Sequence, residues 1–232
     1  MTSASYNVLT YAQAHPIPDE VRANSDRPLR PDVDATAFVT DQLLLGMERR
    51  VASIVSTCGN WAGASNPGTA WSNDASEPLD DIETVIDSVI SKTGTLPNTM
   101  VIAQTTWKTL RNHPDVLERV KYGGFKNVTP QLFSDIVDIP KILIGRSVYN
   151  TALEGATDSM SYVWGDFLWV GFVPPNPGLM IPAAGYCFQW GNREVSRYRE
   201  DQEHQDVIEV QWATDECISC SDAGAIMSDC VS

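Results

Sequence analysis

Basic residues, histidines and cysteines are all scarce in this sequence of 232 residues. Sixteen Lys and Arg residues stand against thirty Asp and Glu residues, which gives a net charge of -14 at pH 7. Proteins that grip nucleic acid through its phosphates normally carry a basic patch. The basic residues around Arg49 and between Arg193 and Arg199 are mixed with acids. The charge therefore argues against such a protein and against membrane-surface binding, and leaves open only weak local contact with DNA.

Long apolar runs and targeting signals are missing as well. No apolar run approaches the about 18 residues of a transmembrane helix. The first residues lack a basic segment followed by an apolar one, so we expect no secretory signal peptide. An odd number of cysteines without such a signal suggests reduced thiols in a cytosol. The five cysteines are Cys58, Cys187, Cys217, Cys220 and Cys230.

Candidates for nucleophilic or acid–base catalysis are few. The three histidines are His15, His113 and His204, and no Gly-x-Ser-x-Gly elbow occurs. His113-Pro114-Asp115 is identical in sequence to the His-Pro-Asp tripeptide of J-domain co-chaperones. We interpret it as the end of one helix and the cap of the next, because Pro breaks a helix and Asp caps one.

Candidates for metal binding are equally weak. Cys217-x-x-Cys220 could be half of a zinc site or a redox pair, but Cys230 offers only a third ligand and no nearby His a fourth. We interpret these cysteines as free thiols near the chain end. Asp80, Asp81 and Glu83 could bind a divalent cation, although the helix dipole also favours acids in a first helical turn. We therefore assign no catalytic, cofactor-binding or metal-ligating residue, and expect no cofactor and no enzymatic activity.

The first half of the chain is predicted to be mainly helical. Residues Tyr6 to Ala14 alternate like a short exposed strand, and residues 15–34, with four prolines, are predicted to be a loop. A long helix is expected from Asp34 to about Cys58, followed by a loop at residues 59–74. The segment "PLDDIETVIDSVISKTG" predicts a second amphipathic helix that ends at Gly94. The apolar stripe of the long helix is Val39, Leu43, Met47, Val51 and Val55.

The remainder predicts an α/β segment followed by strands. Buried strands are expected at residues 100–103 and 141–145, and three short helices between them. The helices should cover residues 105–112, a stretch from Pro114 with Val116, Leu117 and Val120 inward, and a stretch from Pro130 capped by Thr129. A turn is expected at residues 122–127. Strands are expected within residues 161–174, 185–190, 194–201 and 204–217, with a last strand or turn at 221–227. The fold class is therefore α+β.

In this order, the segments resemble the tailed-bacteriophage major capsid proteins with the Hong Kong 97-type fold. The most specific part is "PNTMVI" followed by Trp107, Leu110, His113-Pro114 and Val116. The resemblance covers nearly the whole chain. It is carried by "YNVLTYAQAHPIPDEVRANSDRP", "ATAFVTDQLLLGMERRVASIV", Trp71, "PLDDIETVIDSVISKTGTLPNTMVIAQTTWKTLRNHPDVLERVK", "TPQLFSDIVDIPKILIGRSVYNTA" and "YVWGDFLWVGFVPPNPG".

The resemblance implies a subunit with an extended loop, a peripheral domain and an axial domain. Residues 1–33 would be part of the extended loop. Residues 34–95 and 184–211 would form the peripheral domain, with a long spine helix and a β-sheet, and residues 96–183 and 212–232 the axial α/β domain. The chain begins at what resembles the returning strand of the extended loop, so we expect the N-terminal arm of the family to be lacking. No residues are assigned to covalent crosslinking.

The function implied is structural, namely self-assembly into pentamers and hexamers of an icosahedral head shell that encloses double-stranded DNA. Scaffolding, portal and decoration proteins are further expected partners, DNA contact is expected to be non-specific, and no membrane is expected. The protein would reside in the virion after assembly in the bacterial cytoplasm. Two alternatives stay open, an encapsulin-like nanocompartment shell and an acidic metal-dependent hydrolase using Asp80, Asp81 and Glu83.

Overall fold

The computed structural model describes residues 6–26, 29–121, 127–178 and 180–231. The chain forms two compact units. Unit 1 comprises Met1–Arg50 and Cys187–Cys217, and unit 2 comprises Val51–Tyr186 and Ile218–Ser232. None of the described helices is long and apolar enough to cross a membrane.

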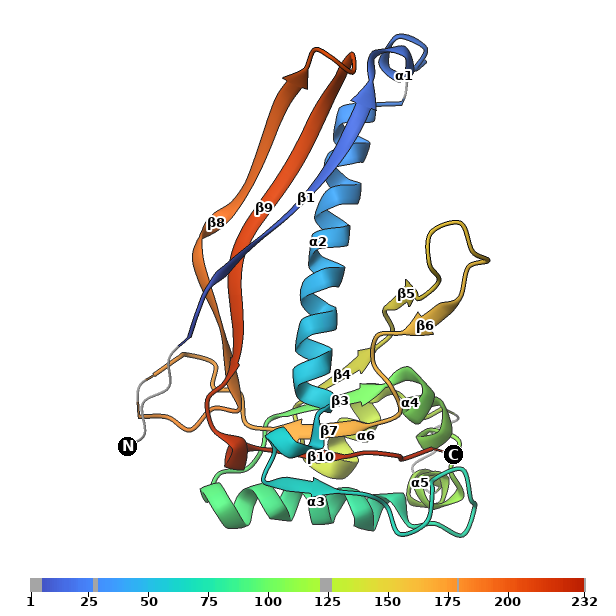
Figure 1. Ribbon diagram of the computed structural model, residues 1–232. Coiled ribbons are helices and arrows are strands. Elements are labelled where there is room, and N and C mark those ends of the chain that lie inside the picture. The colour runs from blue at the N-terminus through green and yellow to red at the C-terminus, as the bar shows by residue number, and fades with distance from the viewer. Residues whose placement is uncertain (1–5, 27–28, 122–126, 179, 232) are drawn as a thin grey trace. The chain divides into compact units, whose positions relative to one another are not determined.

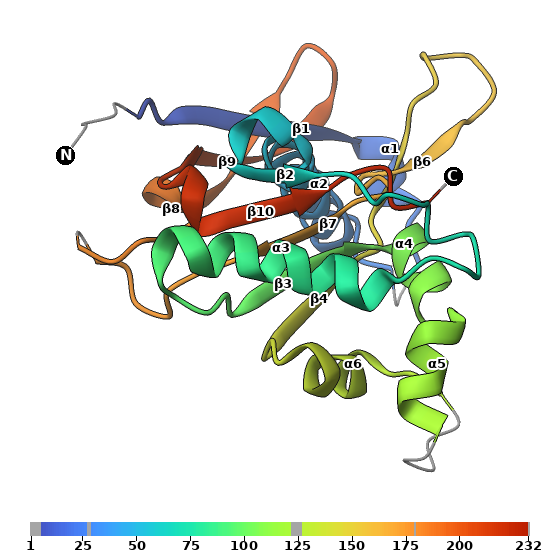
Figure 2. The ribbon, with the colours of Figure 1, turned by 90° about the horizontal axis from the view of Figure 1, so that it is seen from below.

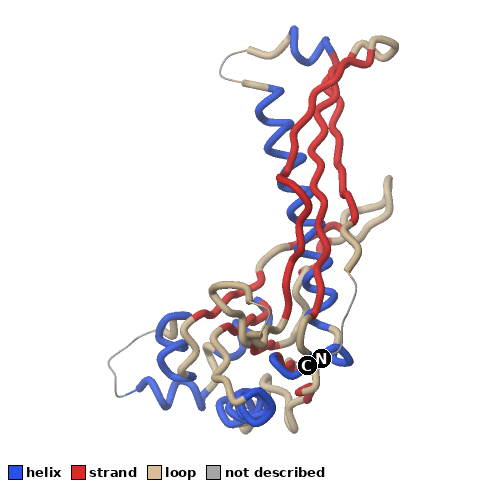
Figure 3. Tube along the Cα trace, turned by 90° about the vertical axis from the view of Figure 1, so that its left-hand side faces the viewer, coloured by secondary structure: helices blue, strands red, loops and turns tan. Residues whose placement is uncertain are grey.

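Unit 1 is built from a long helix and three long strands. The strands lie in the order β1 (Leu9–Pro18), β9 (Gln205–Ile218) and β8 (Gly185–Glu200), and β1 is antiparallel to β9. The helix α2 (Pro31–Ser56) runs alongside the strands (Figures 1 and 3). Two small apolar clusters join the helix to the sheet. Their buried members are Ile17, Ala35 and Ile208 in one, and Val39, Leu43 and Val210 in the other.

The N-terminal segment is more regular than the sequence predicted. Residues 15–34 were expected to be a loop, but β1 continues to Pro18, α1 covers Asp19–Ala23 and α2 begins at Pro31. The prolines are compatible with these elements for physical reasons. β1 is an edge strand, where a missing N–H costs little, and Pro31 occupies the first turn of a helix, where the N–H has no partner in any case.

Unit 2 is organised around a five-stranded mixed sheet. β3 is parallel to β4, β10 is parallel to β2, and β7 is antiparallel to both β3 and β10. Every residue of β3, β7 and β10 is buried. The sheet order is β2 (Gly63–Ser65), β10 (Gly224–Met227), β7 (Leu168–Gly171), β3 (Thr99–Ala103) and β4 (Lys141–Gly145).

Apolar side chains cover both faces of this sheet, because successive residues of a strand point to opposite sides. Met100 and Ile102 join the larger cluster on one face, and Val101 and Trp169 join a second cluster on the other. The larger cluster includes Trp71, Ile82, Val85, Leu110 and Phe133. The helices of unit 2 are α3 (Pro78–Thr93), α4 (Gln104–Leu110), α5 (Pro114–Val120) and α6 (Pro130–Val137), with short 3₁₀ turns at Cys58–Asn60 and Ser221–Ala223.

The helix ends of unit 2 follow the predicted signals. Gly94 ends α3 with a φ of 67°, a left-handed conformation that suits glycine. The Thr129 hydroxyl accepts a hydrogen bond from the Leu132 N–H and so caps α6. The last strand, β10, also lies where a strand or turn was expected.

Several local predictions were wrong. β4 was expected to be buried, but it is an edge strand that exposes Lys141 and Leu143. Leu117 was expected to point inward, yet it is 44% exposed. The loop expected at 59–74 contains β2. The turn expected at 122–127 falls mainly on residues 122–126, which lie outside the described residues.

A two-stranded antiparallel hairpin completes unit 2. It consists of β5 (Val148–Asn150) and β6 (Met160–Tyr162). Residues 51–95, which were expected to belong with the spine helix, lie in unit 2 with the strands of the expected axial domain. The peripheral and axial assignments describe places in a shell, so they stay a prediction.

Candidate assembly surfaces

The three histidines occupy separate surroundings. His113 is buried at the start of α5, where its Nδ1 accepts a hydrogen bond from the Asp115 N–H at 3.2 Å. Its Nε2 lies 3.1 Å from both the Ser76 hydroxyl and the Asn73 carbonyl oxygen. His113 therefore caps α5 and ties it to the loop before α3. A helix boundary was predicted here, but Asp115 was expected to be the cap and instead lies in the first turn of α5. His15 contacts the ring of Phe38, and His204 belongs to the segment between β8 and β9 in unit 1.

The acidic group at the start of α3 has a structural contact. The Asp81 carboxylate accepts a hydrogen bond of 2.8 Å from the indole of Trp71, a fully buried side chain. Asp80 and Glu83 are exposed. Across residues 6–26, 29–121, 127–178 and 180–231, no three His, Cys, Asp or Glu side chains are grouped so as to hold a metal ion. The hydrolase alternative gains no support from this arrangement.

All five cysteines are free thiols. Burial and a hydrogen bond to Asp215 raise the pKa of Cys217 to about 11. Burial also raises the pKa of Cys230 above its usual range. A thiol that stays protonated is a poor nucleophile and a poor metal ligand.

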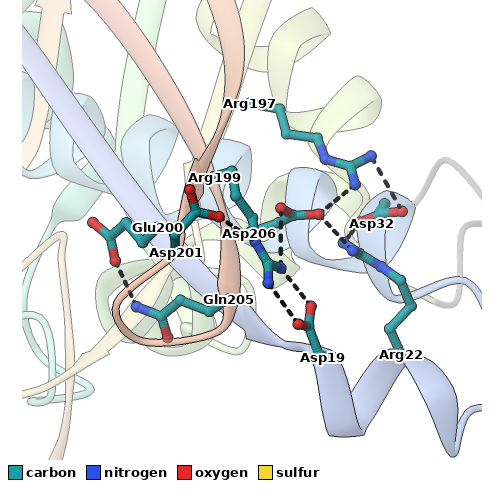
Figure 4. A network of polar contacts seen from close by, with 9 residues as sticks. All are labelled: Asp19, Arg22, Asp32, Arg197, Arg199, Glu200, Asp201, Gln205 and Asp206. Carbon is teal, nitrogen blue, oxygen red and sulfur yellow. Dashed lines mark hydrogen bonds and ion pairs between the residues drawn. The ribbon is translucent and has the colours of Figure 1, made fainter.

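Unit 1 contains a dense network of ion pairs around Asp206 (Figure 4). The Asp206 carboxylate is in contact with the guanidinium groups of Arg22, Arg197 and Arg199. Arg22 donates a second hydrogen bond to Asp32 at 2.8 Å, and Arg199 binds both carboxylate oxygens of Asp19, at 2.5 and 2.7 Å.

These arginines strongly favour the ionised carboxylates. Hydrogen bonds from Arg197 and Arg22 hold the pKa of Asp206 at about 2, below its usual 3.8. The hydrogen bonds from Arg199 likewise lower the pKa of Asp19. The network therefore joins β8, β9, α1 and the start of α2. Sequence reasoning noted the mixture of charges at 193–199 but missed the network, since its members are far apart in the sequence.

A second ion pair stabilises another part of unit 1. The Arg50 guanidinium donates to the Glu216 carboxylate at 3.0 Å and lies over the ring of Tyr11, 3.6 Å from its centroid. Arg50 was noted in the sequence only as part of a mixed cluster. Its contacts join the helix to β1 and β9 within the unit.

Apolar side chains remain exposed on each unit. In unit 1, Val21 and Phe38 border an apolar groove of about 400 Å³, and Leu29 and Val33 are exposed in the same part of the sequence. The groove is lined by His15, Pro16, Ile17, Pro18, Val21, Pro31, Asp34, Ala35 and Phe38. In unit 2, the β5–β6 hairpin exposes 85% of Leu153 and 67% of Met160.

A long helix beside three long strands, together with a mixed sheet flanked by short helices, defines the Hong Kong 97-type fold of phage capsid proteins. The fold is confirmed by solved structures, all less than 25% identical in sequence. A phage-related protein from Bordetella bronchiseptica matches with a TM-score of 0.81 and 24% identity, over 97% of this chain and 77% of that one. A protein of Mycobacterium phage Che8 matches with a TM-score of 0.61 and 14% identity, over 100% and 78%. The capsid of phage XM1 matches with a TM-score of 0.57 and 9% identity, over 96% and 73%.

The sequence is similar to phage major capsid proteins, which confirms the resemblance noted above. The family "Phage major capsid protein E" matches residues 64–131. The major capsid protein of Burkholderia phage BcepMu is 28% identical over 177 residues, 72% of this chain and 56% of that protein. The major capsid protein of Pseudomonas phage JBD67 is 29% identical over 156 residues, 65% and 49%. The chain thus spans about half the length of these curated relatives.

Proposed function

We propose that this protein is a major capsid subunit, which assembles with copies of itself into the pentamers and hexamers of an icosahedral phage head. The proposal rests on the agreement between two findings, a similarity of fold and a similarity of sequence. The fold agrees with a phage-related protein over 97% of the chain, and the sequence is similar to two proteins named major capsid protein.

The exposed apolar surfaces support assembly as the function. Monomeric soluble proteins rarely leave large contiguous apolar patches in water, and subunit interfaces bury apolar and aromatic side chains within a polar rim. The groove beside Phe38 and the hairpin carrying Leu153 and Met160 expose apolar side chains that a subunit interface would bury. Contacts that are weak one by one add up to a stable shell when symmetry repeats them.

The shell would enclose double-stranded DNA. Because the chain carries a net charge of -14, its contact with the DNA phosphates would be weak and non-specific. Scaffolding, portal and decoration proteins are further partners of the proposed subunit, which assembles in the bacterial cytoplasm and resides in the virion. Within the shell, residues 1–33 form part of the extended loop, residues 34–95 and 184–211 the peripheral domain, and residues 96–183 and 212–232 the axial domain. No catalysis is part of the proposal.

The net charge also predicts how assembly responds to salt. Like-charged subunits repel one another at a distance, and salt shortens the range of that repulsion. Raising the salt concentration from low to physiological should therefore promote assembly, as measured by light scattering. Assembly that is insensitive to salt over this range would contradict the prediction.

The decisive experiment is negative-stain electron microscopy with light scattering on the protein expressed from its complete gene. Closed particles, or rings of five and six copies, are the expected result. A monodisperse monomer would refute the assembly function. The contents of the particles distinguish a phage capsid from the remaining alternative. Protein cargo without nucleic acid would indicate an encapsulin-like compartment.

A further inference from the structure

The exposed face of α3 carries a row of acids. Asp80, Glu83 and Asp87 are spaced three and four residues apart, so they lie on one side of the helix. All three side chains are exposed. In the part of the chain that the structure describes, none of them forms an ion pair. The surrounding stretch, residues 74–87, holds six acids and no basic residue.

A basic surface lies on the next two helices. Lys108 belongs to α4, Arg111 to its C-terminal end and Arg119 to the last turn of α5, and all three side chains are exposed. They too form no ion pair with any described residue. Seven of the eight basic residues of unit 2 fall between residues 108 and 146. The same stretch also contains the acids Asp115, Glu118, Asp135 and Asp138, so its basic residues are in excess by three.

The arrangement of the helices directs α5 away from α3 within one copy. α3 and α5 begin side by side, where the Leu79 N–H donates to the Asp115 carboxylate at 3.2 Å. From that point α5 leads away from the line of α3 (Figure 2). Arg119, at the far end of α5, is thereby carried away from the α3 acids.

We infer that the acidic face of α3, formed by Asp80, Glu83 and Asp87, docks on the basic surface of a second copy, formed by Lys108, Arg111 and Arg119. This inference rests on the proposed shell function. Charge complementarity argues for a second copy as the occupant, because unit 2 presents three exposed acids on α3 and three exposed bases on α4 and α5. A contact between two different surfaces repeats head to tail and closes into a ring when the rotation allows.

The overall acidity of the chain does not prevent this contact. At physiological ionic strength the Debye length is about 8 Å, so repulsion between distant charges is screened while charges in direct contact still attract. Each exposed pair is weak by itself. The pairs therefore select the neighbour and its orientation, and apolar contacts elsewhere add to the stability of the assembly.

Three variants test the contact in the full-length protein. The acid-reversed variant carries Asp80→Lys, Glu83→Lys and Asp87→Lys, and the base-reversed variant carries Lys108→Glu, Arg111→Glu and Arg119→Glu. The combined variant carries all six substitutions. Each reversed variant alone juxtaposes like charges, so its critical concentration for assembly, measured by light scattering, should rise at least about tenfold. The combined variant should assemble like the unsubstituted protein.

An equimolar mixture of the two reversed variants gives the sharpest result. Each variant then presents to the other a surface of opposite sign, so alternating rings with an even number of subunits should form, and five-membered rings should not. Electron microscopy distinguishes the two kinds of ring. A mixture that assembles no better than its components would overturn the inference.

A matched control distinguishes the effect of charge on the α3 acids from the effect of the net charge of the protein. Asp41→Lys, Asp135→Lys and Asp222→Lys change the net charge by the same amount as the acid-reversed variant, at other exposed sites. This variant should assemble like the unsubstituted protein, and equal impairment would overturn the inference. Circular dichroism verifies that each variant is folded. Unsubstituted protein that forms no rings or shells refutes the proposed function, whereas normal assembly of all variants refutes only the docking surfaces.

Discussion

The two units contain equal numbers of charged residues but arrange them differently. Each has eight basic and fifteen acidic residues. In unit 1, arginines and aspartates are paired with one another around Asp206. In unit 2, the three exposed α3 acids and the three exposed α4–α5 bases form no ion pair with any described residue. The number of charged residues therefore does not indicate whether they form ion pairs within a unit or remain available for contact with another molecule. Paired charges stabilise a unit internally, and separated charges are available to another molecule.

The units also differ in how much apolar surface they bury. Unit 2 has a large core that includes Trp71, Phe133 and Met100. Unit 1 has two clusters of three buried residues each between its helix and its sheet. We therefore expect core truncations to destabilise unit 2 and loss of ion pairs to destabilise unit 1. Hydrogen exchange followed by mass spectrometry reports on the two units separately.

The largest effect is expected for Trp71→Ala. The Trp71 side chain is fully buried and its indole donates to Asp81, so the substitution leaves a cavity and an unpaired acceptor. The free energy of unfolding should fall by about 3–5 kcal/mol in chemical denaturation, with faster hydrogen exchange in unit 2. Trp190→Ala is the control, because Trp190 in unit 1 is 80% exposed. Equal effects of the two substitutions would contradict the proposed difference between the cores.

The next effect is expected for Asp206→Asn. The substitution leaves Arg22, Arg197 and Arg199 without their shared carboxylate, and repulsion between the three cations then opposes folding. The melting temperature should fall, and exchange should accelerate in β8, β9 and α1. Asp201→Asn is the control, because the Asp201 side chain is 92% exposed and lies 3.4 Å from Arg199 at the edge of the network. Unchanged exchange in unit 1 would show that the network does not stabilise it.

Acid should reproduce this loss in the unsubstituted protein. The pKa of Asp206 is lowered from 3.8 to about 2 in the folded state, so the unfolded chain binds the proton more readily. The stability that Asp206 contributes is therefore fully present above about pH 4 and is lost as the pH falls toward 2. Thermal unfolding between pH 5 and 2 should show a smaller dependence on pH in the Asp206→Asn variant. An identical dependence in both proteins would contradict the assignment.

The smallest effect is expected for Thr129→Ala in unit 2. The Thr129 hydroxyl caps α6, and loss of a helix cap costs about 1 kcal/mol. Thr129→Ser keeps the hydroxyl and should retain most of the stability in the same denaturation experiment. If the Ser and Ala variants were equally destabilised, the effect would come from the threonine methyl group instead of the cap.

The sequence predicted best the elements that have local signals. α3 has apolar residues at helical spacing, acids in its first turn and Gly94 at its end, and each signal acts within a few residues. β3 is a short apolar run of the length typical of strands. The prolines of residues 15–34 misled the prediction, because their effect depends on whether a strand lies at an edge, and that is set by distant residues.

The surfaces were less predictable for the same reason. Arg22 and Asp206 form one contact but are 184 residues apart in the sequence. The exposure of Lys141 and Leu143 depends on β4 being the last strand of its sheet. Asp80 and Glu83 of the α3 acid row were noted in the sequence, where they were interpreted through the helix dipole, but Asp87 was not. Its lack of internal partners became apparent only from the folded unit.

The most direct test is a cryo-electron microscopy reconstruction of the assembled particle, at a resolution that traces helices. The account predicts rings of five and six copies, with α3 of each copy against α4 and α5 of its neighbour. Rings in which α3 faces solvent would contradict the docking surfaces. Particles without fivefold and sixfold rings would contradict the assignment as a shell subunit.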